Sequence, residues 1–144
     1  MEGNQDNETN IKRFHLYRGL RQIIHGLDSY RDGIARNFGI SGAALYLLVC
    51  IEQSPQCSYK ELAEYAGLAP NTVSSVLRSL IHQQFVSVVT DPIDRRIIRL
   101  NLTQAGSKIV EDTWNLLQST SQAETDAQCT ERVYHQLNQI CGPS

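Results

Sequence analysis

Two short amphipathic segments that are adjacent in the chain constrain the fold more than any other feature. They are SYKELAEYAG at residues 58–67 and APNTVSSVLRSLIHQQ at residues 69–84. Four small or branched residues in them fall at offsets of zero, four, ten and thirteen: Ala63, Gly67, Val73 and Val76. Alanine suits the point where two helices touch, glycine can adopt the positive φ of a turn, and branched residues wedge the second helix onto the first. The spacing therefore predicts a helix-turn-helix, with Pro70 at the start of its second helix.

A β-hairpin is predicted directly after this pair of helices. Two apolar runs, FVSVVT at 85–90 and RIIRLNL at 96–102, are joined by the charged stretch DPIDRR at 91–96. In the second run Ile98, Leu100 and Leu102 alternate with Arg99 and Asn101, which is the period of a strand with one buried face. A helix-turn-helix followed by a hairpin is a winged helix. We therefore expect a mainly α fold with a small β-hairpin wing, whose winged-helix lobe spans about residues 55–102.

Long helices are predicted on both sides of this lobe. Between Ile11 and Arg36 apolar residues recur at steps of four and three, as along a helix that pairs with another: Leu16, Leu20, Ile23, Leu27, Tyr30 and Ile34. We call this set the α-seam. A chain of this size cannot easily bury so long a helix, so part of the α-seam is expected to pack on a second chain. Gly19, Gly26 and Gly33 also recur there, which favours a close approach of another element, although flexibility or coincidence would explain them too.

The rest of the chain completes the predicted organisation. The polar residues 1–10 are expected to be a disordered tail, and residues 11–144 a single domain. Ser41 is predicted to cap a buried helix, and Thr103 a helix that runs to about Ser119. The polar stretch STSQAETDAQ then favours a kink or an interruption before a last helix. Residues of about 11–36 and 104–141 are thus expected to be the N- and C-terminal dimerisation helices.

Composition excludes several classes of function. With 41% hydrophobic and 19% charged residues the chain is typical of a soluble globular protein, and we expect it in the cytoplasm with free thiols. No apolar stretch approaches the roughly 20 residues that span a bilayer. The four histidines do not have metal-ligand spacing, and there is no phosphate loop and no nucleophile–base set, so neither an enzyme nor a cofactor or metal site is expected. Acidic residues outnumber basic ones by 15 to 13, so any polyanion must be bound by a local patch.

The second helix of the predicted helix-turn-helix offers one such patch. Its outward positions carry short polar side chains and one arginine that can donate two hydrogen bonds to one base: Pro70, Asn71, Thr72, Ser74, Ser75, Arg78, Ser79 and His82. Such side chains suit base edges and phosphates in a major groove of DNA. A merely solvated helix face is the alternative.

The tip of the hairpin offers a second patch. Asp94 and Arg96 are two residues apart, so on an extended segment they would project to the same side. The carboxylate could then hold the guanidinium in one pose, in which it can enter a narrow minor groove, while Arg95 reaches a phosphate and Pro92 stiffens the turn. The alternative is an exposed ion pair worth less than about 1 kcal/mol.

These motifs together resemble the MarR family of winged-helix transcriptional regulators. The family's wing pattern, D-P-x-D-R-R followed by L-T-x-x-G, is matched by Asp91, Pro92, Asp94, Arg95, Arg96, Leu102, Thr103 and Gly106. The resemblance implies a homodimer with interlocked first and last helices, which reads a pseudo-palindrome in double-stranded DNA. It places the recognition helix at 70–83 and makes Arg96, oriented by Asp94, the minor-groove arginine. It further implies a repressor that a small molecule releases.

The chain departs from the family pattern where charge is concerned. Many relatives carry a basic residue where Ser75 stands, a glycine near Gln84, and charged residues where Ser87, Val88 and Val89 stand. Fewer cations mean fewer phosphate contacts, so we expect a modest or strongly salt-dependent affinity for DNA. A winged helix that binds proteins instead of an operator is therefore the alternative function.

The signal that would regulate such a protein is less well defined by the sequence. Arg21, His25 and Tyr46 are candidates for a ligand cleft near the dimerisation helices. A thiol-based redox sensor is the alternative. Cys50 lies in an apolar helix, where a thiol is usually inert, whereas Cys57 precedes a predicted helix N-terminus, a setting that can lower the pKa of a thiol.

Overall fold

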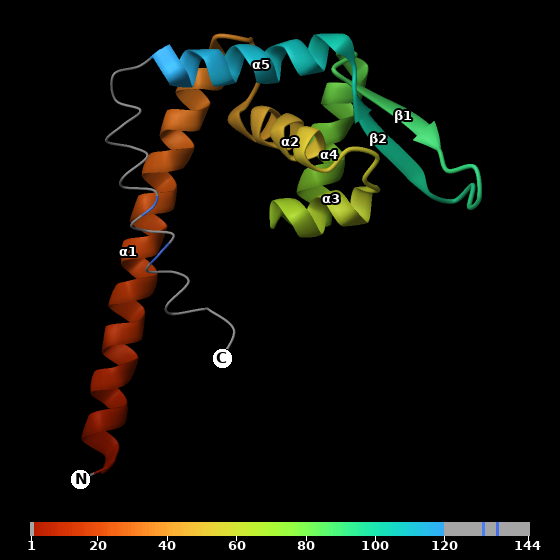
Figure 1. Ribbon diagram of the computed structural model, residues 1–144. Coiled ribbons are helices and arrows are strands. Elements are labelled where there is room, and N and C mark those ends of the chain that lie inside the picture. The colour runs from red at the N-terminus through yellow and green to blue at the C-terminus, as the bar shows by residue number, and fades with distance from the viewer. Residues whose placement is uncertain (1, 120–130, 132–134, 136–144) are drawn as a thin grey trace.

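A computed structural model describes residues 2–119, 131 and 135 of the chain (Figure 1). Five helices and two strands follow one another in the order α1 (Glu2–Arg36), α2 (Gly42–Gln53), α3 (Tyr59–Ala66), α4 (Pro70–His82), β1 (Val86–Thr90), β2 (Ile98–Leu102) and α5 (Gln104–Ser119). The mainly α fold with a β-hairpin wing is therefore confirmed. The predicted last helix, with the polar stretch before it, lies outside the described residues.

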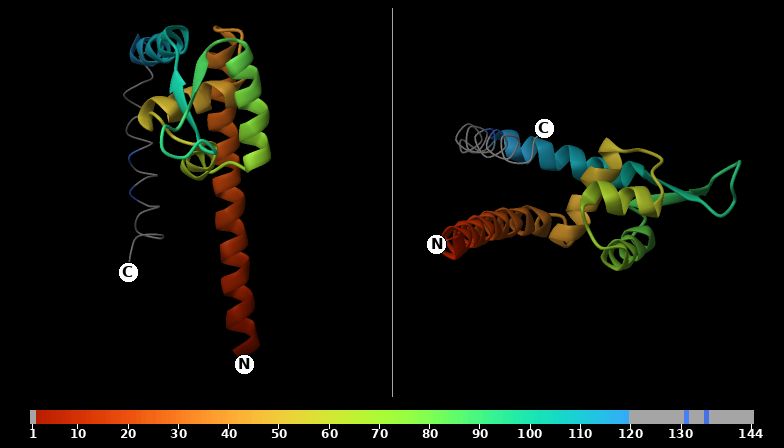
Figure 2. Two further views of the ribbon diagram at one scale, coloured as in Figure 1. Left: turned by 90° about the vertical axis from the view of Figure 1, so that its right-hand side faces the viewer. Right: turned by 90° about the horizontal axis from the view of Figure 1, so that it is seen from below.

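The long helix α1 extends away from the other described helices and strands (Figures 1 and 2). Only its C-terminal end is buried, at Ile34 and Ala35, which are 8% and 0% exposed. In place of the disordered tail expected over residues 1–10, residues 2–10 form the first turns of α1. These residues are polar but compatible with a helix, and Glu8 pairs with Lys12 one turn later at 2.8 Å.

The α-seam is largely uncovered in the structure. Of its six members only Ile34 is buried and Leu20 is half-buried, while four are exposed: Leu16, Ile23, Leu27 and Tyr30. At Gly19, Gly26 and Gly33 an added Cβ atom would meet nothing within 4 Å. Within the described residues, therefore, no element makes the close approach that the glycine spacing favoured.

The core of the lobe is built around α2. Ser41 caps this helix as predicted, because its Oγ accepts a hydrogen bond from the backbone N–H of Ala44 at 3.1 Å. Leu47 and Leu48 of α2 are completely buried. They belong to one apolar cluster that also contains, among other fully buried side chains, Leu62 of α3, Leu77 and Leu80 of α4, Leu100 of β2 and Val110 of α5.

The predicted helix-turn-helix is formed by α3 and α4. Ser58 and Glu61 make a reciprocal capping box at the start of α3, and Gly67 ends that helix with a φ of 67°. Ala69 precedes α4 without a side-chain cap, and Pro70 occupies its first turn, where a missing N–H costs nothing.

The wing is an antiparallel pair in which Val86 lies opposite Leu102 and Thr90 opposite Ile98. Thr103 joins it to α5: the Oγ1 atom accepts from the N–H of Gly106 at 3.1 Å and donates to the carbonyl of Gln84 at 2.6 Å. A Cβ atom at Gly106 would collide with the backbone carbonyl of Phe85. The L-T-x-x-G motif is thus the junction at which α5 packs tightly against the start of the wing.

Candidate nucleic-acid interface

The outward face of α4 is polar and accessible. Of the residues predicted to read DNA on this helix, Ser74 is half-buried and the others are exposed: Pro70, Asn71, Thr72, Ser75, Arg78 and His82. The opposite face is held in the core by Val73, Leu77 and Leu80. The structure describes no ion pair for Arg78, so its guanidinium can bind a phosphate or a base without first leaving a carboxylate.

At the tip of the wing, Asp94 holds Arg96 with three hydrogen bonds. The backbone N–H and the Nε of Arg96 both donate to Oδ1, and Nη2 donates to Oδ2, each at 3.1 Å. The Arg96 side chain is nevertheless 91% exposed. Its hydrogen bonds lower the pKa of the Asp94 carboxyl, so the pair stays ionised over the physiological range.

The reason given for this pairing at the level of the sequence was wrong. The two residues do not project from an extended segment. A tight turn brings them together, because the N–H of Ile97 donates to the carbonyl of Asp94 at 3.0 Å. The Asp94 carboxylate also accepts from the backbone N–H of Arg96, two residues on, which is the hydrogen bond of an Asx-turn.

A second acid, Asp91, organises the loop from inside. Its Oδ1 accepts from the N–H groups of Ile93 and Asp94 at 2.8 and 2.9 Å, and its Oδ2 accepts from Nε of Arg99 at 3.0 Å. These donors, led by the backbone N–H groups, lower the pKa of Asp91. Asp91 was predicted only as part of the family pattern, although an aspartate before a Pro-x-Asp turn is itself a signal for this geometry.

Sequence reasoning missed the role of Arg99. Its side chain leaves β2, contacts Asp91, and extends Nη1 to the Glu61 carboxylate of α3, with N–O distances of 3.4 and 3.5 Å. Glu61 at the same time accepts from the backbone N–H of Ser58. The capping-box pattern at 58–61 was readable in the sequence, but the contact across 38 residues was not.

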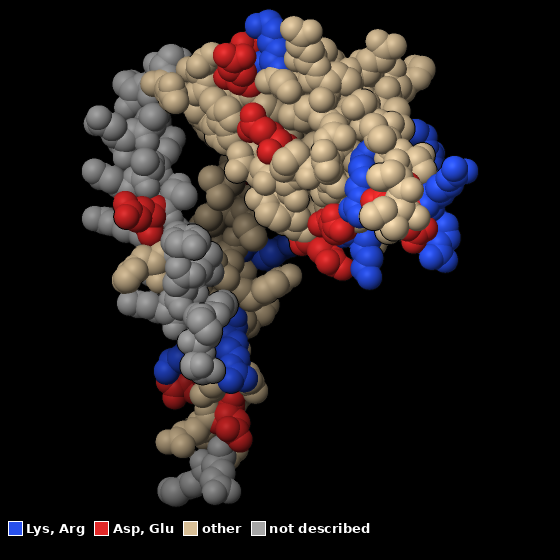
Figure 3. Space-filling view, turned by 45° about the vertical axis from the view of Figure 1, so that its right-hand side comes forward, with Lys and Arg blue, Asp and Glu red and all other residues tan. Residues whose placement is uncertain are grey.

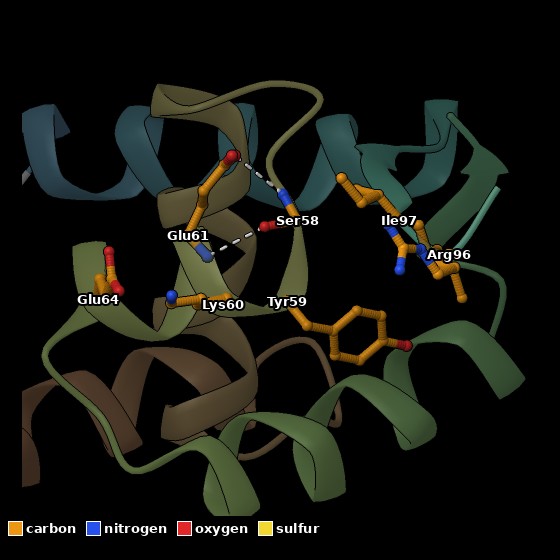
Figure 4. Close-up of a pocket in the computed structure, with 8 residues that line it drawn as sticks. Ser58, Tyr59, Lys60, Glu61, Glu64, Arg96 and Ile97 are labelled. Carbon is orange, nitrogen blue, oxygen red and sulfur yellow. Dashed lines mark hydrogen bonds between the residues drawn. The ribbon is translucent and has the colours of Figure 1, made fainter. Parts of the chain in front are cut away.

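The α3 helix and the wing enclose a surface hollow of about 540 Å³. Eight residues line it: Ser58, Tyr59, Lys60, Glu61, Glu64, Arg96, Ile97 and Ile98. Figure 4 shows the ring of Tyr59 directed from α3 toward the side on which Arg96 and Ile97 lie. A second hollow of about 460 Å³ shares Tyr59, Lys60 and Glu64 and extends to Pro70 and Ser74 of α4. The wing arginine and the start of α4 therefore open onto one continuous surface.

The charge on this side of the molecule is mixed. Lys and Arg side chains gather toward the wing end of the lobe, with Asp and Glu side chains between them (Figure 3). Arg95 is exposed, and no ion pair is described for it. The cationic side chains near the interface for which no ion pair is described are therefore isolated from one another and do not form a broad basic patch.

The candidate ligand residues do not form a site in the described part of the chain. Arg21 and His25 are exposed on α1, whereas the hydroxyl of Tyr46 donates to the carbonyl of Ala66 at 2.8 Å. Neither hollow described above is lined by any of the three. Among the described residues no group of His, Cys, Asp and Glu could hold a metal ion, and no helix is both long and apolar enough to cross a membrane.

The structure contradicts the reactive setting expected for Cys57. The side chain is 2% exposed, and its backbone carbonyl accepts from the N–H of Leu100 at 2.9 Å, so the residue is enclosed by the base of the wing. Burial raises the pKa of the Cys57 thiol, and it raises that of Cys50 as well. Both thiols are therefore poor nucleophiles at neutral pH. Cys129 and Cys141 lie outside the described residues.

These features define a winged-helix protein with an exposed recognition-type helix and an ordered wing arginine. The model of the MarR family matches residues 40–98, which run from the start of α2 to the end of the wing loop. Residues 40–98 therefore match the MarR family of winged-helix transcriptional regulators, the family that the motifs resemble. No curated protein matches the sequence.

Solved structures with the same fold cover most of the chain. A MarR mutant from E. coli complexed with operator DNA is 21% identical, with a TM-score of 0.69 over 84% of this chain and 92% of that one. The transcriptional repressor CouR, bound to a 23-mer DNA duplex, is 16% identical, with a TM-score of 0.73 over 85% and 89%. A MarR transcriptional regulator from Methanosarcina mazei Go1 is 18% identical, with a TM-score of 0.67 over 87% and 97%.

Proposed function

We propose that this protein is a dimeric transcriptional regulator that binds a pseudo-palindromic DNA site. In each lobe α4 enters the major groove and Arg96 the adjacent minor groove. The observation that carries the proposal is the state of Arg96, which is 91% exposed yet held by three hydrogen bonds to Asp94. An arginine fixed in this way loses little rotamer freedom when it enters a groove whose potential is strongly negative.

The arrangement of α4 supports the same conclusion. Asn71, Thr72 and Ser75 are exposed near the start of the helix, where a recognition helix contacts base edges. Arg78 follows on the exposed side and is not committed to a carboxylate among the described residues. Because the wing arginine and the start of α4 border one surface, both elements can contact the same duplex.

Two of the similar structures strengthen the assignment. CouR and the E. coli MarR mutant, which share the fold of this chain, were solved with DNA. We transfer from them only the mode of binding, a winged helix against a duplex. The operator itself depends on side chains that differ between proteins of such low identity.

Dimerisation through α1 is part of the proposal. The α-seam leaves Leu16, Ile23 and Leu27 between 45% and 60% exposed on one helix, which a second copy of the chain would cover. Two lobes related by a two-fold axis then require half-sites with the same symmetry. The family resemblance further suggests a repressor that a small molecule releases from DNA.

The test is a titration of the protein with the DNA upstream of its own gene at several salt concentrations. Arg96→Ala should weaken binding by about 1–3 kcal/mol and reduce the salt slope by about one, because one phosphate-region cation is lost. Lys108→Ala is the matched control, since it removes one exposed cation from α5, outside the proposed interface. It should leave affinity nearly unchanged. A wild-type protein without salt-sensitive affinity for this DNA would instead favour the protein-interaction function.

A further inference from the structure

The outer half of the wing has little packing to hold it in place. The strand ladder ends at the pair of Thr90 and Ile98, and Val88 and Val89 are 44% and 55% exposed. Ile93 at the tip is 95% exposed. A two-stranded hairpin is marginally stable without support from other elements. The direction in which Arg96 points must therefore be fixed by contacts other than apolar packing.

Arg99 supplies such contacts from the middle of β2. Its Nε donates to Asp91 at 3.0 Å on the loop side, and its Nη1 lies 3.4 Å from the nearest Glu61 oxygen on the helix side. The side chains of Arg99 and Asp91 are only 28% and 15% exposed, so water screens this pair less than an ordinary surface ion pair. Five donors in a rigid plane allow one guanidinium to bind both carboxylates, which a lysine could not do with the same geometry.

We propose that Arg99 is a positioning residue, which joins the wing loop to α3 and so sets the place of Arg96 relative to α4. The inference deepens the proposed function and rests on it. Arg99 acts through Asp91 and Glu61 and need not contact DNA, because its side chain is only 28% exposed and both carboxylates bind it.

The contacts form an unbroken path from the wing arginine to the recognition helix. Arg96 is held by Asp94, whose backbone N–H donates to Asp91. Asp91 binds Arg99, which reaches Glu61. Glu61 also closes the capping box of α3 by accepting from the Ser58 N–H, and α3 packs against α4. Every link is a hydrogen bond of the described residues or a helix–helix contact.

The positioning role can be measured without any DNA. We would follow hydrogen exchange at the backbone amides of Asp91 and Ile97, which close the loop by donating to Ile97 and Asp94 respectively. In Arg99→Gln both amides should exchange about 10-fold faster, since the loop opens more often. Arg95→Gln is the matched control, because it removes the same charge from the wing but no described ion pair, and exchange should stay at the wild-type rate. Unchanged exchange in Arg99→Gln would overturn the positioning role.

A second variant separates positioning from direct DNA contact by the sign of its effect. Asp91→Asn keeps an oxygen for the two loop N–H groups but removes the charge that binds Arg99. The protein becomes more positive by one, which alone would tighten binding to a polyanion. If Arg99 positions the wing, Asp91→Asn should instead lower the affinity for DNA by about 3- to 10-fold. Equal or tighter binding by Asp91→Asn would show that the Asp91–Arg99 ion pair does not position the wing for DNA, and would overturn the proposal.

The double variant Arg96→Ala with Arg99→Gln completes the test. If Arg99 acts by aiming Arg96, the double variant should bind about as weakly as Arg96→Ala alone. Additive losses would contradict the proposal. Should the wild-type protein bind no DNA, the proposed function fails, and the exchange measurement still decides whether Arg99 fixes the wing.

Discussion

The winged-helix lobe buries most of its large apolar side chains, whereas α1 leaves most of its own exposed. In the lobe Leu47, Leu48 and Leu77 are completely buried by neighbouring elements of the same chain. On α1, Leu27 is 60% and Phe14 is 60% exposed. The helix α1 and the wing extend from opposite sides of the lobe (Figure 2). Within the described residues, the lobe thus buries its own apolar side chains, whereas most of those of α1 are left exposed.

This difference separates the two parts of the proposed mechanism. The lobe positions α4 and the wing by contacts within one chain. The distance between two such lobes would depend on α1, of which the described residues bury only the C-terminal end. Substitutions in α1 should therefore change the dimer equilibrium, whereas substitutions in the lobe should change its own free energy of unfolding.

The largest effect is expected from Leu27→Glu in the α-seam. In each of the two copies the substitution removes a leucine, worth about 1.5–3 kcal/mol when buried, and introduces a charge, so the dimer loses this contribution twice. The dimer should dissociate at micromolar concentration, whereas the thermal unfolding of the lobe should change little. Mass measurement in solution together with calorimetry checks both. If the wild-type protein is already monomeric at this concentration, α1 does not pack on a second copy, and the proposed difference between the two regions is wrong.

A core substitution in the lobe should act in the reverse way. Leu48→Ala should lower the free energy of unfolding by about 2–5 kcal/mol, because a fully buried side chain leaves a cavity. Denaturant titration checks the value. Leu27→Ala is the control. When both variants are measured over the same series of dilutions, only the loss of stability caused by Leu27→Ala should depend on protein concentration. An equal, concentration-independent loss in both would show that α1 is packed like the lobe.

Two glycines make the same comparison on a smaller scale. Gly106→Ala should destabilise the protein by about 1–3 kcal/mol, since its Cβ would collide with the carbonyl of Phe85. Gly26→Ala, where nothing lies within 4 Å of an added Cβ, should stabilise α1 by up to about 1 kcal/mol. Thermal unfolding measures both. Weaker dimerisation in Gly26→Ala would instead reveal the close partner helix that the glycine spacing favoured.

The smallest effect should come from pH. The pKa values of Asp91 and Asp94 are lowered in the folded protein, so their ion pairs and hydrogen bonds contribute fully above the unfolded value of about 3.9. The contribution is lost only as the pH falls through the lower folded values. Wing order should thus be constant between pH 8 and 5. The chemical shifts of the two aspartate carboxyl carbons, followed with pH in the folded and in the denatured protein, measure this. Titration of either carboxyl above pH 5 in the folded protein would contradict the prediction.

Several elements of the structure were predictable because their causes are local. The Ser41 and Thr103 caps and the turn at Gly67 depend on residues within one or two turns of the chain. The buried face predicted for β2 was wrong except at Leu100, since Ile98 is 41% exposed and Leu102 is only half-buried. The family wing pattern further led from Asp94 to Arg96, and the structure places these two residues together. The turn that joins them was missed, because the sequence spacing of two fits both a strand and a turn.

Contacts between distant segments could not be predicted in the same way. Cys57 precedes a helix N-terminus, yet Leu100 of the wing encloses it, and burial reverses the expected effect on its pKa. Arg99 was read only as a residue on the solvent side of a strand. Its carboxylate partners lie 8 and 38 residues away, and no local pattern indicates which of the acids in the chain it meets.

Local sequence patterns were enough to predict the order of the described elements, the helix-turn-helix, the position of the wing and the apolar face of α1. Each follows from the periodicity or the backbone preference of residues that are neighbours in the chain. The tertiary structure alone decided which thiols are buried, that the start of α4 shares a surface with Arg96, and that Arg99 ties the wing to α3. These depend on how separate segments pack in three dimensions, because burial and charge pairing are set by distances in space and not along the chain.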